Sequence, residues 1–101
     1  MSSGLAINKV YKKYNLERKG YKKIRMDFEL VIYKDYGDFD IEVSGLENYR
    51  MKRVYGKVYV WQKKDILRTV KRIEYTSFEQ LYNILMTIDS LSLDEIIEYE
   101  F

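Results

Sequence analysis

Alternating apolar and charged side chains predict two strands in the first half of the chain. Over residues 24–33 the apolar residues stand at every second position, with Arg25, Asp27 and Glu29 between them. Residues 38–44 repeat the alternation, and KDYG at 34–37 supplies turn-forming residues between the two segments. Because successive strand side chains point to opposite faces, we expect a hairpin with one apolar face. That face carries Ile24, Met26, Phe28, Leu30, Ile32, Phe39, Ile41 and Val43.

Two further strands are predicted before the C-terminal region. Residues 49–63 form the third, and Gly56 either bulges it or divides it in two. Residues 66–75 fit two structures, because Ile66, Val70 and Ile73 also have helical spacing. The β-branched residues and the short preceding turn favour a strand, which is our prediction.

Helical spacing appears at both ends of the chain. Residues 5–18 place apolar side chains on one helical face, and a flexible basic arm is the alternative for this segment. The clearest helix covers residues 77–89, where Thr76 and Glu79 match a capping box. Ser92 and Glu95 match a second capping box, so a short helix follows, with an edge strand as the alternative for the tail IIEYEF.

These elements predict one α+β domain over residues 1–101. It has an antiparallel sheet of about four strands, a C-terminal helix packed on one face, and an additional N-terminal helix. Residues 1–20 form the basic N-terminal helix or arm, residues 21–75 the sheet, and residues 76–101 an acidic helical segment. The apolar arc of the 77–89 helix spans roughly 200°, more than contact with one sheet requires. We therefore expect a homodimer through Ile84, Met86 and Ile88.

The most informative stretch is RVYGKVYVWQKK at 53–64, where one side of the predicted strand alternates cations with aromatic rings. Rings can stack on unpaired bases while Lys and Arg neutralise phosphates, so this row suits single-stranded nucleic acid. The alternative is a sheet face that packs on its own helix or on a partner protein, with lysine stems covering the rings. The candidate nucleic-acid-binding residues, called the basic-aromatic row below, are Arg53, Tyr55, Lys57, Tyr59, Trp61 and Lys63.

Composition argues against several kinds of chemistry. The chain contains no cysteine and no histidine, which excludes disulfides, thiolate or imidazole catalysis and the usual zinc ligands. No Gly-rich phosphate loop is present, because the five glycines are scattered. We expect a non-enzymatic protein with no catalytic residues, no metal and no cofactor.

Charge is segregated along the chain, although the net charge is only +2. Residues 1–25 and 49–74 are strongly basic, whereas residues 26–48 and 75–101 are strongly acidic. The carboxylates of 38–42 fall on one predicted strand face, with Asp27 and Glu29 across the hairpin. Such clusters hold Mg²⁺ in some nucleases, but the Glu-x-Lys spacing of restriction-type nucleases is missing, so a solvated face is the preferred interpretation.

The second half of the chain resembles the positive cofactor four family of transcription coactivators and, more distantly, the Whirly proteins. Trp61 matches the family's strand aromatic, Lys71 and Arg72 its basic lead-in, Ile73 its strand, and Glu79-Gln80-Leu81 its helix start. The family's glycine before the isoleucine is Arg72 here, and the loop length differs. The resemblance covers about half of the chain and implies a helix-mediated dimer that binds single-stranded DNA on its sheet.

The composition also looks like that of small orphan proteins of viruses that infect hot-spring archaea. Abundant Lys and Glu without cysteine fit a thermophile, and AT-rich phage genomes yield a similar composition. No membrane span or signal-peptide core is visible, so we expect an intracellular protein, in the host cytoplasm if it is viral.

Two functions follow from these observations. The first is non-catalytic binding of single-stranded nucleic acid through the basic-aromatic row. The alternative is a small protein-interaction module, such as a viral inhibitor of host defence or transcription, with a host protein as partner.

Overall fold

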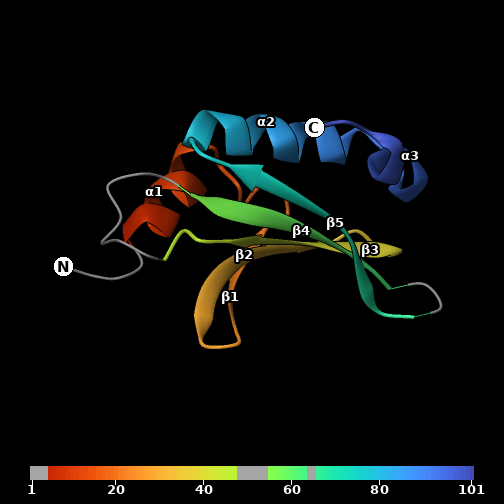
Figure 1. Ribbon diagram of the computed structural model, residues 1–101. Coiled ribbons are helices and arrows are strands. Elements are labelled where there is room, and N and C mark those ends of the chain that lie inside the picture. The colour runs from red at the N-terminus through yellow and green to blue at the C-terminus, as the bar shows by residue number, and fades with distance from the viewer. Residues whose placement is uncertain (1–4, 48–54, 64–65) are drawn as a thin grey trace.

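The computed structural model describes residues 5–47, 55–63 and 66–101 and shows a five-stranded sheet with three helices (Figure 1). The strands lie in sequence order, and each is antiparallel to the next. This confirms an α+β fold, with five described strands where about four were expected. The elements are α1 (Leu5–Lys13), β1 (Lys22–Met26), β2 (Glu29–Asp35), β3 (Phe39–Ser44), β4 (Gly56–Gln62), β5 (Arg68–Tyr75), α2 (Phe78–Asp89) and α3 (Leu93–Glu98).

The hydrophobic core lies between one face of the sheet and the three helices, which are on the same side of it (Figure 1). Register places Val43 beside Val58 and Ile41 beside Val60, and all four side chains are fully buried. Helix α2 contributes four buried side chains to this core, Leu81, Ile84, Leu85 and Ile88. Among the described residues, no helix has the length and hydropathy needed to cross a bilayer.

The predicted strand over 24–33 is wrong, because it is two strands joined by a tight turn. β1 ends at Met26 and β2 begins at Glu29, and these two residues are paired. Asp27 and Phe28 between them have φ angles of 49° and 68°, as a two-residue type I′ hairpin requires at both central positions. The Asp-Phe pair lacks the glycine or asparagine that usually signals such a turn. Because the alternation of apolar residues continues across it, the sequence predicted one uninterrupted strand. Ile24 consequently pairs with Val31 on the face away from the helices, not on the core side with Ile32.

Most other local predictions hold with shifted boundaries. The turn after β2 lies where expected, with Gly37 at a φ of +97°, and residues 68–75 form a strand. Gly56 begins β4, and the register shift lies instead between Val60 and Trp61. Helix α1 ends at Lys13, earlier than predicted. The N-cap of α2 is Ser77 and not Thr76, whereas the capping box of Ser92 and Glu95 is present and α3 is helical.

The wide apolar arc of α2 is largely covered within the chain. Ile84 is 6% exposed and Ile88 is fully buried, while Met86 is half-buried against the same core. On another flank, the ring of Tyr82 stacks on Tyr14, with the ring centroids 4.4 Å apart. Contact with the sheet and with the segment after α1 therefore explains the arc. The two isoleucines have little free surface for a second copy, so their burial argues against the dimer contact predicted at Ile84 and Ile88.

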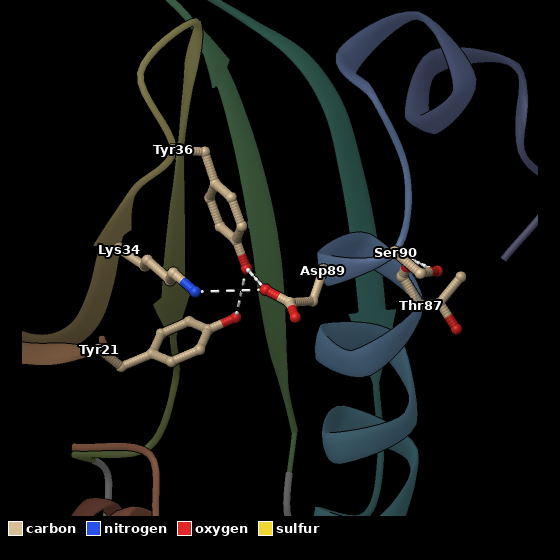
Figure 2. A network of polar contacts seen from close by, with 6 residues as sticks. All are labelled: Tyr21, Lys34, Tyr36, Thr87, Asp89 and Ser90. Atoms are coloured by element: carbon tan, nitrogen blue, oxygen red, sulfur yellow. Dashed lines mark hydrogen bonds and ion pairs between the residues drawn. The ribbon is translucent and has the colours of Figure 1, made fainter. Parts of the chain in front are cut away.

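The end of α2 is joined to the sheet by a polar network (Figure 2). Asp89 Oδ1 lies 3.2 Å from Lys34 Nζ and accepts a 3.1 Å hydrogen bond from the Tyr36 hydroxyl, which lies 3.1 Å from the Tyr21 hydroxyl. Burial raises the pKa of Tyr21 to about 12 and holds the pKa of Tyr36 far above its usual value, so both phenols stay neutral. The helix dipole disfavours a carboxylate at this end of α2, and the Lys34 ammonium offsets that effect.

Candidate functional site

Strand β4 has the alternation predicted for it. Val58 and Val60 are fully buried in the core. Lys57, Tyr59 and Trp61 point to the opposite face and are half-buried. In the described part of the chain no helix covers that face (Figure 1), and we call it the helix-free face.

The other members of the basic-aromatic row lie around β4. Tyr55 precedes the strand and is 45% exposed, and Lys63 follows it. Residues 49–54 of the predicted third strand, which include Arg53 and Val54, lie outside the described residues. The structure therefore brings Lys57, Tyr59 and Trp61 together on one surface, with Tyr55 and Lys63 at the two ends.

Register places a carboxylate opposite each of these three residues. Glu42 and Asp40 on β3 pair with Tyr59 and Trp61, and Glu74 on β5 pairs with Lys57. The indole Nε1 of Trp61 also donates a hydrogen bond of 3.1 Å to Glu42 Oε1. Carboxylates therefore lie on both sides of the basic-aromatic row, with Arg72 of β5 opposite Tyr59, and alternation along a single strand cannot reveal this.

Asp40 is the centre of a small network at one end of this face. It is 9% exposed, and its Oδ2 accepts a short hydrogen bond from the Tyr33 hydroxyl. Lys63 Nζ lies 3.0 Å from Asp40 Oδ1 and 2.5 Å from Asp35 Oδ1. Hydrogen bonds to both carboxylates hold the pKa of Lys63 well above its usual value, and the same lysine lowers the pKa of Asp35. Lys63 therefore neutralises carboxylates of its own chain and is poorly placed to bind a phosphate.

Glu42 is the carboxylate that lies beside both Tyr59 and Trp61. Burial raises its pKa, and the nearby carboxylates of Glu29 and Asp27 raise it further, while the Trp61 N–H acts in the opposite direction. Glu29 itself accepts a 2.6 Å hydrogen bond from the Gly45 N–H. No group of carboxylates suited to a metal ion occurs among the described residues. Glu29, Asp40 and Glu42 each accept a hydrogen bond from another residue of the chain.

The charges of the helix-free face nearly cancel. It carries four cations and five carboxylates on the described strands and their ends, so its net charge is slightly negative. These residues are Lys22, Lys57, Lys63 and Arg72, and Glu29, Asp35, Asp40, Glu42 and Glu74.

An apolar section adjoins the charged one, and sequence reasoning missed its most exposed member. Ile24 and Met26 on β1 and Val31 on β2 lie on the helix-free face of the first hairpin. That hairpin projects away from the helix layer (Figure 1), and Phe28 at its tip is 97% exposed. No local signal separated Phe28 from a strand residue, because its position continues the apolar alternation.

No family model, curated protein or solved structure matches this chain. The resemblance to the positive cofactor four family stays an expectation, and the functional argument depends on the chain's own geometry.

Proposed function

We propose that this protein is a non-catalytic protein-binding module that contacts its partner through the helix-free face and the Phe28 tip. The observation that carries the proposal is the carboxylate opposite each of Lys57, Tyr59 and Trp61. A surface with rings and charges of both signs is complementary to another protein surface, where opposite charges and apolar contacts alternate.

The same observation weighs against a polyanionic ligand. A base stacked on one ring contributes about 1–3 kcal/mol. A phosphate about 7 Å from a carboxylate is repelled by about 1 kcal/mol at an effective dielectric constant of about 40. Glu42 lies beside both rings, so its repulsion offsets part of the stacking on one ring, whereas Lys63 neutralises Asp40.

Phe28 supports a protein partner as well. Its ring is 97% exposed, so it contributes little to the core. Its φ of 68° is a left-handed conformation that costs an ordinary residue about 1–2 kcal/mol. An exposed ring on a strained turn is unfavourable for folding, and such features concentrate at contact sites. Aromatic anchors of this kind dominate the binding energy of protein interfaces.

The test selects peptides from a random display library on the immobilised wild-type protein and measures their affinity for purified variants by fluorescence anisotropy. Phe28→Ala and Trp61→Ala should each weaken the selected peptides at least about tenfold, as expected for anchor residues. Phe101→Ala is the matched control, because this ring is 39% exposed but lies on the C-terminal tail. Peptides that bind all three variants like the wild type would refute the proposal.

Single-stranded nucleic acid is the second candidate, favoured by the placement of Tyr55, Tyr59 and Trp61 away from the helices. Glu42→Gln separates the two candidates, because it removes a negative charge beside the rings while keeping an acceptor for Trp61 Nε1. If nucleic acid is the ligand, the variant should bind an oligonucleotide about 3- to 6-fold more tightly at low salt. Under the protein-binding proposal, wild type and variant should both fail to bind it saturably at physiological salt.

A further inference from the structure

Strand β5 is a long edge strand of the sheet. It pairs with β4 on one side, and in the described part of the chain no strand pairs with its other side. It has eight residues, and the whole sequence contains no proline. Natural sheets usually block such edges with short strands, prolines or charges. The opposite edge, β1, has only five residues and its charges are all cations, whereas β5 is longer and carries charges of both signs.

An open groove of about 990 Å³ runs beside this edge. Its walls are residues 71–74 of β5, the exposed side of α2 with Gln80, Asn83 and Thr87, and the tail at residues 99–101. Lys71 does not project across the edge, because its Nζ donates a 3.0 Å hydrogen bond to the Ile97 carbonyl and a short one to the Tyr99 carbonyl. The edge therefore borders open space under α2, where another strand and its side chains can lie.

The sequence of β5 is complementary to itself when two copies run antiparallel. If Ile73 is opposite Ile73 of the second copy, Arg72 lies opposite Glu74 of that copy, and the contact occurs twice. Arg72 and Glu74 both point to the helix-free face, where they pair with Tyr59 and Lys57 of β4. Opposite charges directly across two antiparallel strands are stabilising, and like charges are destabilising.

We propose that two copies of this protein pair through β5, with a two-fold axis at Ile73, to form one continuous sheet. The twofold contact is isologous, as is usual in homodimers. The charge match selects a second copy over an unrelated extended peptide, because the same strand supplies both partners of the ion pair. This inference does not depend on the proposed function, because it rests on the unpaired backbone edge of β5, although Arg72 and Glu74 also lie on the helix-free face.

The first measurement is sedimentation velocity of the wild-type protein at concentrations up to about 200 µM. The expected result is a monomer–dimer equilibrium within this range. Arg72→Glu and Glu74→Arg should each weaken dimerisation about 10- to 100-fold, because two attractive contacts per dimer become repulsive. Circular dichroism and thermal melting establish that each variant is folded.

Restoring the charge match tests the register itself. The double variant Arg72→Glu/Glu74→Arg exchanges the two charges and should dimerise like the wild type. An equimolar mixture of the two single variants should also form a heterodimer, because each Glu then faces an Arg. A general loss of stability cannot produce either rescue.

Lys22→Glu, a charge reversal on the other edge strand, is the matched control and should leave dimerisation unchanged. A wild-type chain that stays monomeric throughout the range would overturn the proposal. Dimers that persist in both single variants, or that are not restored by the exchange and the mixture, would also overturn it.

Discussion

Gly56 should be intolerant of even one additional carbon. A Cβ at this position would lie 2.2 Å from the Ser44 carbonyl oxygen and 2.4 Å from the Tyr75 hydroxyl oxygen. Both distances are well inside van der Waals contact. Tyr75 is fully buried, and its hydroxyl donates a 2.5 Å hydrogen bond to that same carbonyl. The methyl group of Gly56→Ala would therefore force apart a buried donor and its acceptor.

The magnitude follows from three contributions. Overpacking of a tight site costs about 1–3 kcal/mol, and separating a buried hydrogen-bonded pair costs about 1–3 kcal/mol. Replacing glycine by alanine returns about 0.4–1 kcal/mol through the unfolded chain. The free energy of unfolding should fall by about 3 kcal/mol, which corresponds to a melting temperature lower by about 10–20 °C for a domain of this size.

Urea unfolding followed by far-UV circular dichroism measures this change, and Gly37→Ala is the matched control. A Cβ at Gly37 would meet no atom within 4 Å, so only its φ of +97° opposes the substitution, at a cost of about 1 kcal/mol. Tyr75→Phe should partly relieve the loss of stability in Gly56→Ala. It removes the Tyr75 hydroxyl, one of the two oxygens that the new methyl group would meet. If Gly56→Ala is within about 0.5 kcal/mol of wild type, or less harmful than Gly37→Ala, the reasoning fails.

Three further predictions concern stability. Phe28→Gly creates an Asp-Gly turn suited to the positive φ angles, so the free energy of unfolding should rise by about 0.5–1 kcal/mol; a decrease in the urea midpoint would contradict this. The pKa of Glu42 is raised in the fold, so the native state binds more protons than the unfolded state, and stability should fall as pH rises through the raised pKa. Glu42→Gln should remove this fall of stability with pH and should be more stable than the wild type at pH 7. If urea unfolding from pH 4 to 7 gives the same pH dependence for both proteins, the raised pKa of Glu42 is not its cause. Tyr36→Phe removes the hydroxyl between Asp89 and Tyr21 (Figure 2) and should lower the free energy of unfolding by about 1 kcal/mol. A melting temperature equal to that of the wild type would contradict this prediction.

Local features of the sequence determined much of the secondary structure. The helix over residues 78–89, the capping box of Ser92 and Glu95, and strands β3 and β4 were predictable because their signals lie within a few neighbouring residues. Residues 66–75 fitted both a strand and a helix, so the local signal did not settle β5. Alternation in β4 also determined that Val58 and Val60 are buried while Tyr59 and Trp61 point the other way.

Tertiary structure decided the features that depend on distant residues. The turn at Asp27-Phe28 follows from pairing between β1 and β2, since its two residues lack the glycine or asparagine that usually marks such a turn. The burial of Ile84 and Ile88 follows from the packing of α2, which a helical arc alone does not specify.

The character of the candidate surface was decided in the same way. Along β4 the sequence shows cations alternating with rings, whereas register adds Asp40, Glu42 and Glu74 from the neighbouring strands. Periodicity along one strand determines which face a side chain occupies, but strand pairing determines which charges lie about 5 Å away across the sheet. Because Coulomb energies depend on those distances, the ligand class favoured by this face depends on the fold and not on the strand sequence alone.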